Sequence, residues 1–132
     1  MGAEFITTRP DAQRAGHGSD LVLIDGWGAI SGVLPIDLGN DRTHLPEQVE
    51  AQTKKVLANL ETILAARGLG TESVVAVRIA LVDLPRLQER METAYAGFFP
   101  ANRLPARSVV GVSHLPRGAL VAMDFTLRIP SP

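Results

Sequence analysis

The chain has 132 residues, a formal net charge of −1 and no cysteine. This length suits a single hydrophobic core, so we expect one domain over residues 1–132. The near-neutral charge counts against a nucleic-acid or membrane surface, and the lack of cysteine excludes disulfides and thiolate chemistry. No apolar run approaches the ~20 residues that span a bilayer, and no signal peptide is visible, so a cytoplasmic protein is expected.

The chain is predicted to begin with strands. Residues 4–8 form a possible short strand. An apolar run at 21–24 and a second strand at 27–34 are separated by an Asp-Gly pair, which is a strong hairpin signal. Gly28 and Gly32 interrupt the second strand, and such glycines mark bulges or points where a backbone or ligand approaches closely.

Two helices are predicted after this hairpin. From Pro46 onward, apolar residues recur at helical spacing until Gly68, which is a natural C-terminal cap. A β-branched run over residues 73–82 predicts a strand that is buried on at least one face. Pro85 then opens a second helix, whose inner stripe is predicted to be Leu87, Met91, Ala94, Tyr95 and Phe98.

Two strands, 107–112 and 119–129, are predicted to complete the chain. In the second of them, alternate residues point to opposite faces. One face has Val121, Met123, Phe125, Leu127 and Ile129, and the other has Ala122, Asp124, Thr126 and Arg128. The apolar set must lie under the helices, which predicts a two-layer α+β domain with both helices on one face of a mixed sheet. The other face is partly apolar and uncovered, so we expect it, with Val109 of the 107–112 strand on the same side, to pack between subunits.

Arg107 stands at the mouth of a predicted strand, just after Pro105. An arginine there can present a planar fork of donors to a carboxylate or a phosphate. A surface or interface ion pair explains the same residue, and spacing alone does not separate the two readings. Asp124 is open in the same way, since a carboxylate on the non-helical face is either paired at an interface or part of a site.

Other chemistry is poorly supported by the sequence. His17, His44 and His114 lie far apart without ligand spacing, so no metal site is expected. Ser31 precedes Gly32 but lacks the Gly-x-Ser-x-Gly elbow of serine hydrolases.

Five stretches occur in order along almost the whole chain. They are Ile30-Ser31-Gly32-Val33-Leu34-Pro35, the helix around Gln52, Tyr95 with Phe98-Phe99, Pro105-Ala106-Arg107-Ser108 and Leu115-Pro116-Arg117-Gly118. In this order the chain resembles the Rid family of reactive-intermediate deaminases. These are also called YjgF-like proteins and are often labelled endoribonuclease L-PSP or translation inhibitors.

The resemblance implies a chorismate-mutase-like α+β fold and a homotrimer with ligand clefts between neighbouring subunits. It implies hydrolysis of 2-imino or 2-enamino acids to 2-keto acids and ammonia, without metal or cofactor. By the same resemblance, Arg107 binds the substrate carboxylate and Ser31-Gly32 lines the cleft. The partners implied are a small carboxylate ligand and further copies of the chain, with no membrane and no nucleic acid.

The chain departs from the family pattern at four positions. The family's last-strand glutamate, which positions water, aligns with Ala122, and the tyrosine of the first loop aligns with Asp11. The asparagine of the second helix aligns with Glu92, and a common cysteine aligns with Val109. We therefore expect Glu92, more than Asp124, to take over acid–base chemistry. The predicted catalytic residues are Arg107, Glu92 and Asp124, and the predicted substrate-binding residues are Ser31, Gly32, Asp11, Tyr95, Val109 and Ala122.

Three functions follow from this reading. The first is a cofactor-independent hydrolytic deaminase of small imino or enamino acids, or of a related reactive carboxylate metabolite. The second is a non-catalytic trimeric module that binds a small carboxylate, which the missing glutamate favours. The third, an endoribonuclease, is opposed by the near-neutral charge and the lack of a basic patch.

Overall fold

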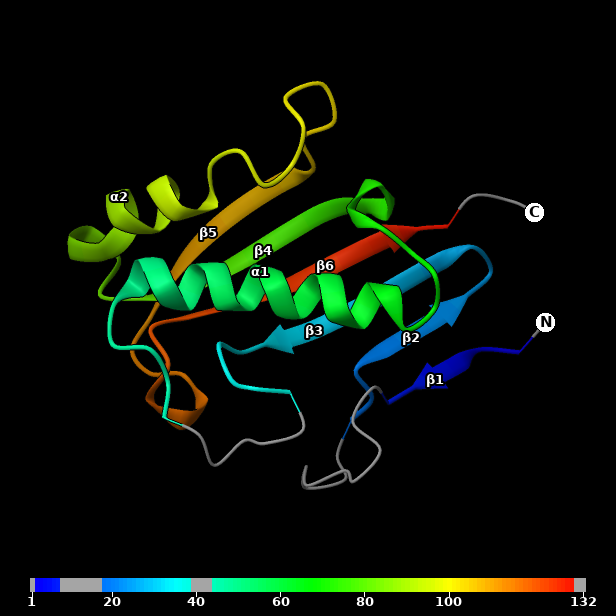
Figure 1. Cartoon of the computed structure of the whole chain (residues 1–132), viewed down its shortest axis with the longest axis horizontal. Coiled ribbons are helices and arrows are strands. Elements are labelled where there is room, and N and C mark those ends of the chain that lie inside the picture. The colour runs from blue at the N-terminus through cyan, green and yellow to red at the C-terminus, as the bar shows by residue number, and fades with distance from the viewer. Residues whose placement is uncertain (1, 8–17, 39–43, 130–132) are drawn as a thin grey trace.

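The structure is a computed structural model that describes residues 2–7, 18–38 and 44–129. In these ranges it contains six strands and two α-helices (Figure 1). They are β1 (Glu4–Ile6), β2 (Leu21–Ile24), β3 (Trp27–Val33), α1 (Val49–Ala65), β4 (Val74–Val82), α2 (Leu84–Tyr95), β5 (Ala106–Val112) and β6 (Val121–Arg128). Short 3₁₀ turns at Thr71–Ser73 and Pro116–Gly118 precede β4 and β6.

The six strands form one mixed sheet in the order β1-β2-β3-β6-β4-β5. All neighbouring strands are antiparallel except β4 and β5, which run parallel and are connected through α2. Both helices lie on the same side of the sheet (Figure 1). The predicted two-layer α+β architecture is therefore confirmed.

The predicted first hairpin is confirmed by its turn. Asp25 and Gly26, between β2 and β3, have φ values of 51° and 80°. A two-residue turn with positive φ at both positions matches the right-handed twist of the flanking strands. Asp tolerates this conformation and Gly adopts it without steric cost, so the Asp-Gly pair determines the register of β2 on β3.

Helix α1 begins at Val49, three residues later than predicted. Gln48 before it is extended, with φ −94° and ψ 143°. The side chain of Gln52 donates a 2.7 Å hydrogen bond to the carbonyl of Pro46 and accepts one of 2.8 Å from the N–H of Leu120. The Pro46 carbonyl is therefore bound to a side chain rather than to a helical N–H.

The strand limits differ from prediction by a few residues. β4 begins at Val74 because residues 71–73 form a 3₁₀ turn, with the Ser73 side chain bonded to the Gly70 carbonyl. β6 extends over Val121–Arg128, inside the predicted 119–129, and β3 ends at Val33. β5 begins one residue earlier than predicted, at Ala106.

The core lies between the helices and one face of the sheet. Val121, Met123, Phe125 and Leu127 of β6 are buried there, and Ala122, Asp124, Thr126 and Arg128 face the other side, as their alternation predicts. We call that other side, not covered by α1 or α2, the open face. In the described ranges, no helix is long and apolar enough to cross a membrane.

Candidate functional site

Arg107 and Glu92 form a two-pronged ion pair between β5 and α2. Arg107 Nη1 lies 2.7 Å from Glu92 Oε1, and Arg107 Nη2 lies 2.8 Å from Glu92 Oε2. The two side chains are 29% and 33% exposed, so the pair is partly shielded from water yet accessible. Parallel N–H···O bonds of this kind define the orientation of both groups.

Tyr95 completes this cluster one helical turn after Glu92. The Arg107 guanidinium carbon lies 4.9 Å from the centre of the Tyr95 ring, which is a cation–π contact. Burial raises the pKa of the Tyr95 hydroxyl and the Glu92 charge adds to this, whereas Arg107 opposes it. The pKa of Arg107 is itself raised, mainly by its hydrogen bonds to Glu92. Arg107 therefore stays a cation.

The cluster lines a cavity of about 300 Å³ at the edge of the sheet. Its other walls are apolar and come from the end of α2 and the loop before β5. The lining residues are Glu92, Tyr95, Ala96, Gly97, Phe99, Leu104, Pro105 and Arg107. Such a cavity suits a small ligand with one charged end and an apolar body.

The alternation of side chains along β5 determines that Arg107 points to the helical side of the sheet. Arg107 pairs with Val77 of β4 in the parallel ladder, and Val77 is buried under the helices. Val109, two residues on, pairs with buried Ile79 and packs against the same core. The placement of Val109 on the open face was therefore wrong, because strand alternation puts it on the side of Arg107.

A second polar cluster lies on the open face. The carboxylate Oδ1 of Asp124 accepts a 2.7 Å hydrogen bond from the N–H of Gly32 and one of 3.2 Å from the Ser31 hydroxyl. The β3–β6 register shifts between Ile30 and Val33, and Gly32 has a φ of 65°. Gly32 therefore belongs to a β-bulge whose backbone conformation disfavours side chains, as its position in the strand predicts.

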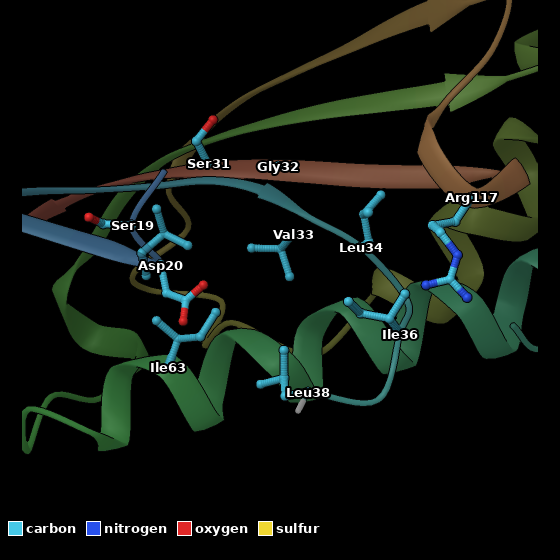
Figure 2. Close-up of a pocket in the computed structure, with 11 residues that line it drawn as sticks. Ser19, Asp20, Ser31, Gly32, Val33, Leu34, Ile36, Leu38, Ile63 and Arg117 are labelled. Atoms are coloured by element: carbon cyan, nitrogen blue, oxygen red, sulfur yellow. The ribbon is translucent and has the colours of Figure 1, made fainter. Parts of the chain in front are cut away.

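The bulge also turns Ser31 away from the core. Below it, a cavity of about 230 Å³ lies between β3, the segment after it and α1. Figure 2 shows Val33, Leu38 and Ile63 directed into this space, with Arg117 at its edge, while the Ser31 hydroxyl points to the other side of β3. The outward-facing Ser31 hydroxyl and the Gly32 N–H both donate hydrogen bonds to Asp124.

Ala122 and Arg78 flank Asp124 on the open face. Ala122 pairs with Ala80 of β4, and Asp124 pairs with Arg78. The predicted shared face of Ala122 and Asp124 is thus confirmed, although Ala122 is only 7% exposed. The Arg78 side chain is exposed and forms no ion pair within the described ranges. Sequence reasoning missed Arg78, whose signal is a charge inside an otherwise apolar strand.

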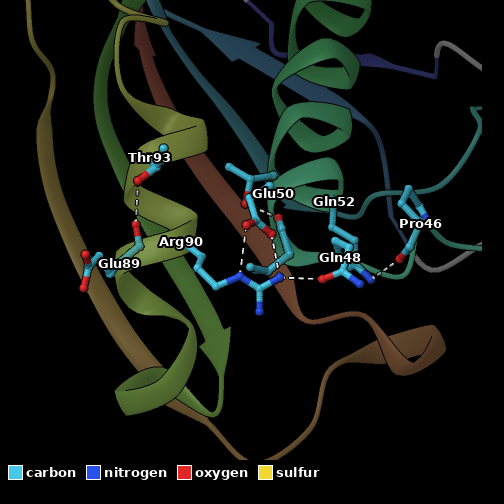
Figure 3. Close-up of polar contacts among 9 residues, drawn as sticks. Pro46, Gln48, Glu50, Gln52, Glu89, Arg90 and Thr93 are labelled. Atoms are coloured by element: carbon cyan, nitrogen blue, oxygen red, sulfur yellow. Dashed lines mark hydrogen bonds and ion pairs between the residues drawn. The ribbon is translucent and has the colours of Figure 1, made fainter.

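A second ion pair joins α2 to α1. Arg90 donates to both carboxylate oxygens of Glu50, at 3.0 Å and 2.8 Å, and also to the side chain of Gln48 (Figure 3). The hydrogen bonds from Arg90 lower the pKa of Glu50. Arg90 and Glu92 belong to the same helix, but neither Arg90 nor Glu50 lines the Arg107 cavity.

The predicted site residues thus form two groups rather than one. Arg107, Glu92 and Tyr95 come together on the helical side of β5, and Ser31, Gly32 and Asp124 come together on the open face. Asp11 lies outside the described residues. Among the described residues, no three histidine, aspartate or glutamate side chains could hold a metal ion together.

The Endoribonuclease L-PSP family model matches residues 8–128. The chain belongs to the Rid family. A RutC family protein of Pyrococcus abyssi is 30% identical over 124 residues, covering 94% of this chain and 95% of that protein. The chloroplastic Reactive Intermediate Deaminase A of Arabidopsis thaliana is 34% identical over 121 residues, covering 92% of this chain and 63% of that protein.

Solved Rid structures share the fold of this chain. YyfA of Yersinia pestis, a Rid-family protein of unknown function, superposes with a TM-score of 0.85 at 29% identity. That match covers 97% of this chain and 100% of YyfA. The chorismate-mutase-like Rid fold that the resemblance implies is therefore confirmed.

Proposed function

We propose that this Rid-family protein is a cofactor-independent hydrolase of small 2-imino or 2-enamino acids, in which Arg107 binds the substrate carboxylate. The observation that supports this is the Arg107 guanidinium itself. It lines a small, otherwise mainly apolar cavity and stacks on Tyr95, and its two terminal nitrogens already hold a carboxylate with two-pronged geometry. A site built to hold one carboxylate in this way can hold another of the same shape.

We also propose that the complete cleft forms between subunits of a homotrimer. In one chain, Arg107 contacts α2 on the helical side of the sheet, whereas Asp124 and the Gly32 N–H lie on the open face. The open face carries exposed apolar side chains such as Trp27, and small residues such as Ala80 and Ala122, which pair across β4 and β6. Packing this face on a neighbour would remove apolar area from water and place one subunit's Asp124 group near the next subunit's Arg107.

The test is a trapping assay. An amino-acid oxidase generates the imino acid in situ, semicarbazide competes for it, and ammonia and semicarbazone are measured. We expect the protein to speed ammonia release and reduce the semicarbazone, and Arg107→Ala to lose both effects. The matched control is Glu50→Gln, which alters a glutamate–arginine pair away from this cavity. If the wild-type protein changes neither ammonia release nor semicarbazone formation, the proposed hydrolase activity is wrong.

A non-catalytic binding module is the second candidate function. The observation that favours it is Ala122, a buried methyl group at the position where the family glutamate would position water. If that module is correct, calorimetry will detect L-2-aminobutyrate or 2-ketobutyrate bound to the wild-type protein, and the trapping assay will detect no hydrolysis.

A further inference from the structure

The carboxylate held by Arg107 in this structure belongs to the protein itself. Each oxygen of Glu92 accepts from one terminal nitrogen of Arg107, so the end of the guanidinium fork is occupied. A substrate carboxylate that binds end-on at this position must displace Glu92. Within the described ranges, Arg107 is the only cation in ionic contact with Glu92.

The net charge of the ligand decides whether this displacement is favourable. A 2-keto acid brings one negative charge, so two carboxylates would compete for one guanidinium, and the displaced Glu92 would stand beside a like charge. Among the described residues, the rest of the cavity offers no cation, because its remaining walls are Tyr95, Phe99 and aliphatic or backbone groups. A ligand that also carries a positive nitrogen gives Glu92 a new partner.

We infer that Glu92 binds the protonated nitrogen of the substrate while Arg107 binds its carboxylate. This rests on the proposed function, in which Arg107 is the carboxylate site. One internal ion pair is exchanged for two pairs with the ligand, so the site selects small zwitterions that carry an iminium or ammonium group beside a carboxylate. Glu92 is thereby a specificity-determining residue, and simple 2-keto acids are poor ligands.

The same exchange suits the chemistry of hydrolysis. A protonated imine is the electrophilic form, and a carboxylate beside its nitrogen stabilises that form. Water adds to the imine carbon, the carbon–nitrogen bond breaks, and one iminium and one water yield one 2-keto acid and one ammonium ion. Because the keto acid has no positive nitrogen, Glu92 returns to Arg107 and displaces the product.

The Glu50–Arg90 pair provides a matched control for this inference. It is also a two-pronged arginine–glutamate pair that involves α2 (Figure 3). Neither of its residues lines the Arg107 cavity. Removing the Glu50 charge therefore changes a comparable ion pair without changing the ligand site. If removing the charge of Glu92 and removing that of Glu50 change ligand binding alike, the cause is a change in the helix rather than the loss of a ligand contact.

The experiment is calorimetry with two stable probes, L-2-aminobutyrate as the zwitterion and 2-ketobutyrate as the simple anion. We expect the wild-type protein and Glu50→Gln to bind the zwitterion about tenfold more tightly than the anion. In Glu92→Gln this order should reverse, since the zwitterion loses its partner and the anion loses its competitor. Arg107→Ala should weaken the binding of both ligands.

The outcomes separate this inference from the proposed function. If the ratio of the affinities for the two probes is the same in the wild type and in Glu92→Gln, the proposed role of Glu92 is wrong, even if the trapping assay shows hydrolysis. A reversed order without hydrolysis would support the ion-pair exchange and reject the enzyme. If neither probe binds the wild-type protein, the inference and the carboxylate role of Arg107 both fail.

Discussion

The N–H of Gly32 and the carboxylate of Asp124 lie 2.7 Å apart, although the two residues are 92 positions apart in the sequence. Asp124 stabilises the bulge of β3 through this bond and the one from Ser31. The bulge, in turn, is what directs Ser31 to the open face while Ile30 and Val33 both stay in the core. Any role of Asp124 in chemistry is thus combined with a structural one.

Asp124→Ala should therefore destabilise the protein by about 1 kcal/mol, the usual net contribution of a hydrogen bond in a partly exposed setting. Asp124→Asn retains an acceptor for the Gly32 N–H and should lose less. Urea denaturation of the two variants measures the difference. If both variants are as stable as the wild-type protein, the bond does not stabilise the bulge.

Gly28→Ala should destabilise the protein by about 1–3 kcal/mol, through crowding in the core. A Cβ at Gly28 would lie 2.9 Å from Leu23 Cδ2 and 3.2 Å from Leu127 Cβ. Gly32→Ala is the contrast, because its Cβ would meet nothing within 4 Å and its cost comes from the left-handed backbone, about 1–2 kcal/mol. Shortening Leu23 to Val, which removes the nearest atom Cδ2, should partly rescue only the Gly28 variant, and rescue of both would contradict the steric cause.

The single tyrosine of the chain reports on the Arg107 cluster. A pH titration followed by tyrosinate absorbance should show a pKa of Tyr95 above its ordinary value of 10.0. Glu92→Gln should lower that pKa, because it removes a neighbouring negative charge, and Arg107→Met should raise it further. If the pKa of Tyr95 in Arg107→Met is at or below that in the wild type, the contact between Arg107 and Tyr95 is contradicted.

The same shift predicts how stability changes in alkali. Below about pH 10 the tyrosine is protonated in both the folded and unfolded chains, so it contributes no pH dependence. Above that pH the unfolded state loses its proton first, and the free energy of unfolding should fall as the pH rises towards the folded pKa. Tyr95→Phe should remove this part of the pH dependence, which urea denaturation across that range measures.

Light scattering should give about three times the chain mass of 14.1 kDa. Ala80→Arg introduces a long charged side chain on the open face, beside Ala122, and should produce monomers that lack hydrolytic activity. Ala58→Arg makes the same change on an exposed position of α1 and should leave the trimer intact. A wild-type protein that scatters as a monomer would reject both the trimer and the shared cleft.

The sequence by itself determined the elements, the two layers and the faces of β6. These depend on local rules: an Asp-Gly turn, the period of apolar residues, and strand alternation, each of which acts over a few residues. The same alternation, applied to β5 without a known neighbour, led to the wrong face for Val109. Which residues of β5 face the helices is decided by the pairing of Arg107 with buried Val77 and by the contact of Arg107 with Glu92 of α2.

Only the tertiary structure decided that Glu92 pairs with Arg107. The two residues lie 15 positions apart in different elements, and no periodicity links a helix surface to the start of the next strand. The sequence had assigned them separate roles, one binding a carboxylate and one acting as an acid or base. Their contact depends on how α2 crosses β5, which is determined by side-chain packing in the core, and it turns two independent candidates into one ion pair.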